Sequence, residues 1–393
     1  MPVSSEAESW PPEVTTACRE LVGWSPVRVE RIGGGRNSRV YRVGREDSQG
    51  APTTFVLKQY LRHPGDRRDR LATEFGAYRF LWDHDVRVVP EPVAMSPELS
   101  VGNYEHIVGD PVRSDIVGEA DVDASVAFLS ELRRVAGSPE SARLGLASEA
   151  GFSVQELLDS LERRLARLAP APDARVQAFI ADAYVPAHSE VVQWCGERLD
   201  AVGLAVTQVL APADRTLSPS DFGFHNAIRR PAGELAFVDF EYFGWDDPAK
   251  TLADWLLHPG MDVRTELRER FAAEFLRSFD PSGDLARRAS IVYPLFGLKW
   301  CLILLNEFVP DDLARRRFAS PREEYVGPSF SSANPAYVGP QYVGPGFSPA
   351  DLGTDPGAVV GGRLQPSLDR QLEKAKVMLA RTLREYQDNP YVT

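Results

Sequence analysis

The chain has 393 residues, of which 43% are hydrophobic and 25% charged, and its formal net charge is -12. These values exclude wholesale disorder, and the acidic balance argues against a protein that binds nucleic acid through a dense basic surface. The length exceeds that of one compact core, so we expect two lobes with a cleft between them.

The cysteines and the apolar pattern indicate the cellular compartment of the protein. Cys18, Cys195 and Cys301 lie far apart and lack the spacing of metal ligands, which argues against a zinc site or a disulfide framework. Residues 1–14 lack the basic and apolar regions of a signal peptide, and no later apolar run reads as a membrane span. We therefore expect a cytoplasmic protein that binds neither nucleic acid nor membrane.

The first region of the chain, 1–108, predicts a small lobe. Alternating apolar residues between turns indicate a largely antiparallel sheet that carries one helix. In chain order, the expected elements are strands 27–32, 39–43 and 53–60, a helix over 67–83, and strands 87–95 and 103–108.

The remainder, 109–393, predicts a larger and mainly helical lobe. A strand hairpin, 226–229 with 235–240, interrupts the helices, since Pro231 and Gly233 lie in its turn. The expected helices cover 122–135, 154–168, 191–206, 248–257, 263–278, 294–308 and 367–386.

Residues 318–365 form an insertion rich in Pro, Gly and Ser that repeats Tyr-Val-Gly-Pro three times. Such a composition lacks a core-forming pattern and predicts an exposed loop. The three tyrosines of the repeats leave a lid over a substrate as the alternative.

A glycine run stands between the first two expected strands. Gly33, Gly34 and Gly35 allow a sharp turn that brings backbone N–H groups close to phosphate oxygens, and Asn37 and Ser38 follow directly. An ordinary glycine-rich hairpin turn without a binding role is the alternative.

Lys58 lies inside an apolar strand, in a chain with only five lysines among its 44 basic residues. A compact ammonium suits contact with phosphate as a point charge, and Glu74 on the following helix could hold it in place. A lysine that protects a sheet edge is the alternative. If Lys58 contacts phosphate, its loss should impair nucleotide use far more than folding.

The most specific pattern joins Asp221, Asn226 and Asp239. One carboxylate can orient a hydroxyl and accept its proton, while an amide and a second carboxylate hold Mg²⁺ through hard oxygen atoms. This arrangement suits phosphoryl transfer. In the alternative, Asp221 and Asn226 only cap turns.

These motifs resemble the aminoglycoside phosphotransferase and choline kinase family, which has a bilobal, protein-kinase-like α+β fold. The resemblance covers about 27–310 and includes the stretch that begins at Asp239 and runs to Asp254. It implies that Asp221 is the catalytic base and that Asn226, Asp239 and Glu241 serve the metal. It also implies that the glycine run, Asn37, Ser38, Lys58 and Glu74 serve ATP.

The resemblance further implies an adenine-binding connector between the lobes, where we select Glu105 and Ile107. Asp247 would brace the catalytic loop. The chain departs from the family at Pro219, because the family usually has His two residues before its catalytic aspartate. That histidine serves as a scaffold, so its loss bears on the geometry of the loop.

We therefore expect a small-molecule kinase that uses ATP and Mg²⁺. Its acceptor would be an amino sugar, aminocyclitol, amino alcohol, sugar or nucleoside. Regions 1–108 and 109–393 would be the nucleotide-binding lobe and the catalytic, substrate-binding lobe. A pseudokinase or regulatory binding module is the alternative from another class, and Pro219 is the feature that favours it. A protein kinase ranks last, since Asp239 is followed within about nine residues by Asp247-Pro248 and a helix.

Overall fold

A computed structural model describes residues 12–33, 37–46, 52–62, 66, 68–310 and 364–392. They form two compact units. The first unit holds the described residues up to Pro111 together with Ile228–Phe237, and the second holds Val112–Ala227 and the described residues from Val238 onward. The division at residue 108 into a nucleotide-binding and a catalytic lobe stays a prediction.

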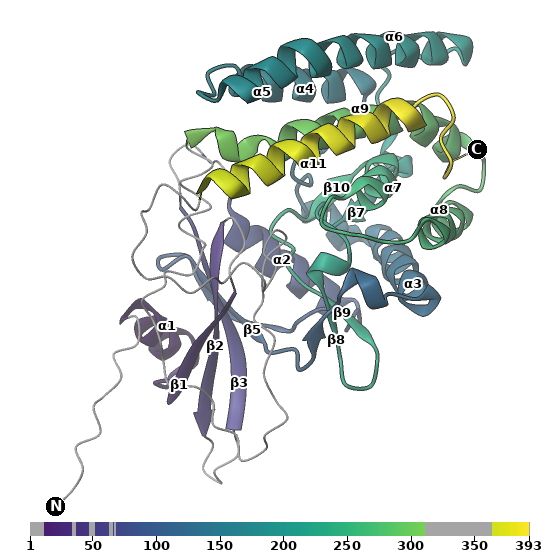
Figure 1. Cartoon of the computed structure of the whole chain (residues 1–393). Coiled ribbons are helices and arrows are strands. Elements are labelled where there is room, and N and C mark those ends of the chain that lie inside the picture. Colours follow the sequence, from purple (N-terminus) through teal and green to yellow (C-terminus); the bar gives the residue numbers. More distant parts are fainter. Residues whose placement is uncertain are drawn as a thin grey trace, which may run out of the picture. The chain divides into compact units, whose positions relative to one another are not determined.

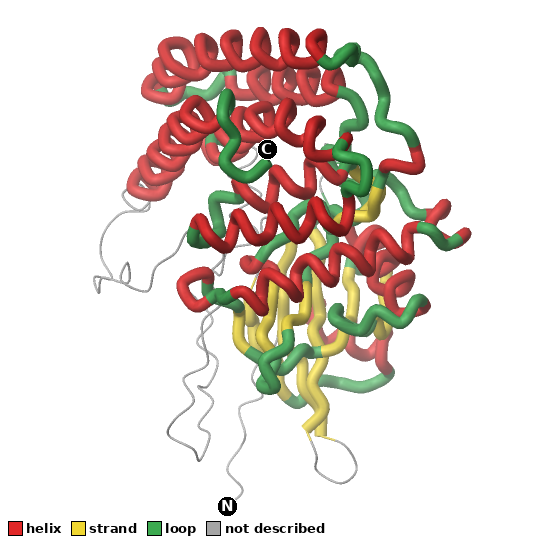
Figure 2. The backbone as a smooth tube through the Cα atoms, turned by 90° about the vertical axis from the view of Figure 1, so that its right-hand side faces the viewer, coloured by secondary structure: helices red, strands yellow, loops and turns green. Residues whose placement is uncertain are grey.

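The first unit contains a five-stranded sheet of order β1-β2-β3-β5-β4 in which every pair is antiparallel (Figures 1 and 2). The predicted small antiparallel sheet is thus confirmed. β3 is a central strand because it pairs with both β2 and β5. The strands are β1 (Arg28–Gly33), β2 (Ser38–Glu46), β3 (Pro52–Tyr60), β4 (Pro92–Ser96) and β5 (Val101–Glu105).

Two helices accompany this sheet. α2 (Arg70–Asp83) is the predicted helix and begins after Asp69, whose carboxylate accepts a hydrogen bond from the backbone N–H of Ala72 at 2.9 Å. α1 (Pro12–Val22) was not predicted. It buries Val14 and Cys18 in a cluster with residues of the sheet, so the amphipathic first helix supplies part of the core of this unit.

A second, small sheet has the order β6-β8-β9, with strands β6 (Asp110–Pro111), β8 (Ala227–Arg229) and β9 (Leu235–Phe237). The predicted turn is present, since Gly233 has φ 97° and its N–H donates to Arg230 O at 2.8 Å. The predicted second strand is too long, because β9 ends at Phe237. Asp239 therefore lies beyond the end of the strand, in the irregular segment before the turn at Glu241 and Tyr242.

The second unit is mainly helical, as predicted. Its helices are α3 (Glu119–Ala136), α4 (Val154–Leu168), α5 (Ala174–Phe179), α6 (Val185–Ala201), α7 (Pro248–Leu257), α8 (Thr265–Phe279), α9 (Asp284–Leu304) and α11 (Leu364–Glu385), with a π-helical turn, Ile180–Tyr184, between α5 and α6. Two short strands, β7 (Thr216–Ser218) and β10 (Gly244–Asp246), pair antiparallel.

Helix α9 packs against α4, α6, α7 and α11, and Figure 1 shows α11 running alongside it. The prediction that this helix begins at Pro294 is wrong by ten residues, because Pro294 lies inside it. A proline inside a helix costs about 3 kcal/mol. Burial of a single leucine or phenylalanine contributes about 1.5–3 kcal/mol. The apolar side chains that α9 buries along its whole length therefore offset the cost of the proline.

Among the described residues, the helical stretch Asp284–Phe308 is long and apolar enough to cross a membrane. However, 78% of its most apolar window is buried inside the fold. It is therefore accounted for as a core helix. The predicted insertion, 318–365, lies outside the described residues except for its last two positions, which begin α11.

Gly297→Ala is expected to destabilise the second unit by about 1–3 kcal/mol, because small-to-large changes in a packed core force neighbours to move. A Cβ at this position of α9 would lie 2.2 Å from Thr382 Oγ1 and 2.9 Å from Thr382 Cγ2, and Thr382 is buried on α11. Urea unfolding measures the change.

Gly196→Ala in α6 is the matched control, since no atom lies within 4 Å of the added Cβ. It should stabilise the protein by about 0.5–1 kcal/mol through helix propensity. Equal effects of the two substitutions would contradict the close contact between α9 and α11.

Candidate active site

In the first unit, β3 and α2 bring Lys58 and Glu74 together. Lys58 Nζ lies 2.6 Å from Glu74 Oε2, and both side chains are almost fully buried. The alternative of a lysine at a sheet edge is wrong, because Lys58 lies on a central strand. The expectation that loss of Lys58 impairs nucleotide use far more than folding assumed an exposed lysine, and the structure corrects this premise, since without Lys58 the Glu74 carboxylate would be buried without this cation.

Three tyrosines complete the surroundings of Glu74. Tyr60 OH donates to Glu74 Oε2 at 2.7 Å, Tyr78 OH donates to Glu74 Oε1 at 3.0 Å, and Tyr104 OH lies 2.7 Å from Tyr60 OH. Burial, with Glu74 and Tyr104 nearby, raises the pKa of Tyr60 well above its ordinary value, so it remains a hydroxyl donor. This network fixes the carboxylate that holds Lys58.

The glycine run connects β1 and β2. Gly33 is the last residue of β1, and Asn37 and Ser38, both buried, stand where β2 begins. Asn37 O accepts a hydrogen bond from Leu61 N at 2.7 Å, which ties this end of the loop to the end of β3. Gly34 and Gly35 lie outside the described residues.

The predicted connector residues lie at the end of β5 and just beyond it, since Glu105 is the last residue of this strand. Glu105 is engaged within its own unit, since its Oε2 accepts from Glu91 N at 3.2 Å and its Oε1 lies 3.6 Å from Arg230 NH2. Ile107 is buried. The side chain of Glu105 thus has a structural partner, and any contact with a base would come from backbone groups.

In the second unit, β7 leads into the loop that carries Asp221. Ser220 has φ 67°, and its N–H donates to Ser218 Oγ at 3.0 Å. Asn226 closes the loop by donating from Nδ2 to Asp221 O at 2.9 Å. Since Nδ2 faces inward, and no group in the described part of the chain donates to Asn226 Oδ1, this oxygen is left as an acceptor suited to a hard cation.

The backbone next to Asp239 is hydrogen-bonded to this loop, since the N–H of Val238 donates to Asn226 O at 2.9 Å. Asp239 has φ 70°, a left-handed conformation that Asp and Asn adopt more readily than most residues. Glu241, two residues further on, is buried. The site residues of the second unit thus come from the loop after β7 and the segment after β9, which are hydrogen-bonded together.

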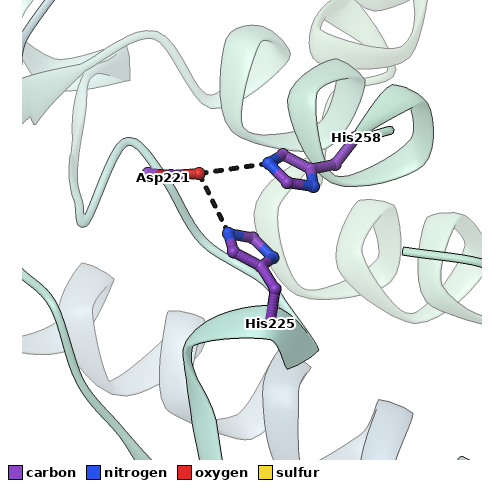
Figure 3. Close-up of side chains that lie close together, drawn as sticks. All are labelled: Asp221, His225 and His258. Atoms are coloured by element: carbon purple, nitrogen blue, oxygen red, sulfur yellow. Dashed lines mark hydrogen bonds and ion pairs between the residues drawn. The ribbon is translucent and has the colours of Figure 1, made fainter. Parts of the chain in front are cut away.

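Asp221 Oδ1 lies 3.0 Å from His225 Nε2 and 3.2 Å from His258 Nε2 (Figure 3). Burial raises the pKa of the Asp221 carboxyl, but the two imidazoles outweigh this effect and hold the pKa well below its usual range. Asp221 is therefore ionised at neutral pH. His258 was not among the predicted residues.

Helix α7 begins shortly after Glu241 and contacts the loop that carries Asp221. Asp247 caps α7 through Ala249 N at 2.8 Å and pairs with Arg288 NH2 at 2.7 Å. The prediction that Asp247 braces the catalytic loop is wrong, because among the described residues its side chain reaches α7 and α9 only. Lys250, which donates to Ser220 Oγ at 2.9 Å, makes the contact with the loop.

A small cavity of about 140 Å³ lies beside Lys250 in the second unit. Charged residues of both signs line it, so it is polar. They are Glu149, Glu156, Asp159, Arg163, Asp247, Lys250 and Arg288.

The chain is similar to a known protein family and to several solved structures. The profile of the Phosphotransferase enzyme family (APH) matches residues 28–290. A choline kinase from Cryptosporidium parvum Iowa II superposes with a TM-score of 0.52 at 13% identity, covering 77% of this chain and 92% of that chain.

Choline kinase LicA from Streptococcus pneumoniae superposes with a TM-score of 0.50 at 16% identity, covering 77% of this chain and 94% of that chain. The streptomycin-ATP-APH(2")-IIa ternary complex superposes with a TM-score of 0.50 at 15% identity, covering 80% of this chain and 97% of that chain. No curated protein matches the chain. These structures confirm the protein-kinase-like α+β fold, and because the family profile spans two thirds of the chain, the protein belongs to the phosphotransferase enzyme family.

Proposed function

We propose that the protein is a small-molecule kinase that transfers the γ-phosphoryl group of ATP to a hydroxyl of a small metabolite or antibiotic-like acceptor. The observation that carries the proposal is the ionised, partly exposed Asp221 carboxylate beside Asn226, whose amide oxygen is left as an acceptor. An ionised carboxylate can accept the acceptor's hydroxyl proton and orient the oxygen for attack.

The roles of the other residues follow from their chemistry. Asn226 and Asp239 would hold Mg²⁺, with Glu241 assisting, because carboxylate and amide oxygens are ligands that this ion prefers. Lys58, held by Glu74, would contact phosphate, and the glycine run with Asn37 and Ser38 would cover it. Backbone groups near Glu105 and Ile107 would receive the base. ATP supplies the phosphoryl group, and the protein supplies orientation and charge.

The test is a panel of hydroxyl metabolites incubated with the purified full-length protein, ATP and Mg²⁺, followed by phosphorus NMR and mass spectrometry. The panel contains amino sugars, aminocyclitols, amino alcohols, sugars and nucleosides. We expect phosphorylation of at least one acceptor. Tight binding of Mg-ATP without any phosphorylated product would instead support a pseudokinase.

Asp239→Asn is expected to weaken Mg²⁺-dependent ATP binding as well as turnover, because an amide oxygen is a poorer ligand than a carboxylate for a hard dication. Asparagine tolerates the left-handed φ of 70°, so the local backbone should persist. Calorimetric titration of ATP with and without Mg²⁺ measures the effect.

Asp85→Asn is the matched control, since Asp85 is exposed and also has a positive φ, of 65°. It should leave Mg-ATP binding unchanged. Unaltered Mg²⁺ dependence in Asp239→Asn would remove Asp239 from the metal site.

A further inference from the structure

Two histidines whose side chains are largely shielded from solvent approach the same oxygen of Asp221. His225 and His258 have side-chain exposures of 7% and 9%, whereas that of Asp221 is 37%. Both Nε2 atoms lie within hydrogen-bond distance of Oδ1, as Figure 3 shows. In the part of the chain that the structure describes, no group donates to Oδ2. The carboxylate is thus held by one oxygen and open at the other.

The hydrogen bonds of His258 determine its tautomer. Gly260 N–H donates to His258 Nδ1 at 3.1 Å, so Nδ1 carries the lone pair. In a neutral imidazole the proton is then on Nε2, which becomes a donor. His258 therefore donates Nε2–H to Asp221 Oδ1, and the backbone after α7 fixes this direction.

His225 also donates from Nε2 to Asp221, but for a different reason. Its Nδ1 is buried and has no hydrogen-bond partner among the described residues. Nδ1 does not decide the tautomer, because a buried donor and a buried acceptor without a partner each cost about 1–3 kcal/mol. Nε2 decides it, since only a protonated Nε2 can donate to the Asp221 carboxylate, whereas an Nε2 lone pair would face the lone pairs of Oδ1 without a proton between them.

The two rings also restrict each other. They stack with centroids 3.9 Å apart and an interplanar angle of 4°. The edge of Trp300 meets the His258 ring at 4.7 Å and 83°, and Trp300 Nε1 donates to Asp254 Oδ1 at 2.9 Å. Neither imidazole can rotate without displacing a packed neighbour, so the donors to Asp221 are preorganised.

The same helix holds the residue before Asp221. Lys250, Asp254 and His258 are spaced by four residues, which places them along one face of α7 and its C-terminal cap. Lys250 Nζ lies 3.4 Å from Asp254 Oδ2 and 2.9 Å from Ser220 Oγ. One face of α7 therefore contacts the catalytic loop at two consecutive residues.

A metal site is the competing interpretation of this cluster. Asp221, His225 and His258 bring their potential ligand atoms within 4.8 Å of one another. Metal binding through His258 Nε2 needs a lone pair there, which would move the proton to Nδ1. Nδ1 would then face Gly260 N–H as a second donor. The hydrogen bond from Gly260 favours the interpretation without a metal.

We propose that His258, together with His225, is a positioning residue that holds Asp221 Oδ1 so that Oδ2 faces the acceptor hydroxyl. This inference rests on the proposed kinase function. In this chain, a histidine at the end of α7 and one beside Asn226 supply the support that Pro219 cannot give. The carboxylate is oriented before the acceptor arrives, which lowers the entropic cost of aligning it.

The test compares His258→Ala, His258→Gln and His188→Gln with an acceptor that the wild type phosphorylates. His258→Ala should lower kcat by about 10- to 100-fold with little change in the KM for ATP, since misplacing a catalytic group costs up to about 10²-fold. His258→Gln keeps an N–H donor and should recover most of the loss. His188, half-buried on α6, is the control and should retain wild-type kinetics.

A double-mutant cycle separates positioning from general damage. In an Asp221→Asn background, His258→Ala should lower kcat less than about twofold further, because residues that act as a unit are non-additive. Full additivity, wild-type kinetics in His258→Ala, or equal losses in the Ala and Gln variants would each overturn the proposal. Thermal melting of every variant reports whether it is folded.

A measurement independent of turnover tests the hydrogen bonds themselves. Proton–nitrogen NMR of histidine-labelled wild type should show His258 protonated at Nε2, with a proton resonance that moves upfield in Asp221→Ala. Protonation at Nδ1, or displacement of the Nε2 proton by stoichiometric Zn²⁺, would overturn the proposal. If the wild type phosphorylates no acceptor, the kinase function fails while this spectrum still decides how Asp221 is held.

Discussion

Asp221→Asn is expected to lower kcat by about 10²- to 10⁴-fold, the usual contribution of a general base. The structure sharpens the reason. The two Nε2–H donors will keep the oxygen of the introduced amide toward His225 and His258, which turns the amide nitrogen outward. The acceptor hydroxyl would then meet an N–H donor where it needs a proton acceptor.

Rapid-quench measurement of kcat, together with calorimetric titration of Mg-ATP, checks this expectation. Nucleotide binding should be nearly unchanged, because the substitution keeps the size of the side chain and leaves Asn226 and Asp239 intact. The hydrogen bond from Asn226 Nδ2 to the backbone oxygen of residue 221 should also persist. Equal activity of the variant and the wild type would refute the role of Asp221 as base.

Lys58→Ala is expected to lower kcat/KM for ATP by about 10²- to 10³-fold, the cost of removing one preorganised charge contact from a transition state. It should also destabilise the first unit. Removing one partner of a buried ion pair costs about 3–5 kcal/mol. The hydroxyls of Tyr60 and Tyr78, which still donate to Glu74, place the loss near the lower end of that range.

A second substitution separates the two effects. Lys58→Ala with Glu74→Gln removes the buried carboxylate as well, so urea unfolding should show most of the stability restored while kcat/KM stays low. Lys376→Ala, which breaks an exposed ion pair with Glu373, is the control and should change stability by less than about 1 kcal/mol. Recovery of activity in the double variant would mean that Lys58 serves folding alone.

The chain's few lysines were an informative sequence signal. Of the five, Lys58, Lys250 and Lys299 are buried in the structure. Lys58 could be matched to Glu74 from sequence, because a strand and the helix after it form one local unit. Lys250 gave no such hint, since in the sequence its partners look like solvated carboxylates, Asp246 before the helix and Asp254 within it.

His258 left a weak sequence signal that was not used. Helix α7 is buried throughout, and Lys250, Asp254 and His258 recur on it at a spacing of four. Three polar residues on one face of a buried helix indicate a polar partner. The sequence does not name that partner, because 37 residues separate His258 from Asp221 and only the packing of α7 against the loop brings them together.

Residue type and short-range spacing by themselves determined the antiparallel sheet with its helix, the helical remainder and the family resemblance, and they selected Asp221, Asn226 and Asp239 as the predicted site. These features depend on local periodicity and on turns, which nearby residues encode. The tertiary structure decided what depends on long-range packing: the burial of Lys58 on a central strand, the continuation of α9 through Pro294, and the contact of His258 with Asp221. Local propensity cannot specify them, because their free energy comes from neighbours that are distant in the chain.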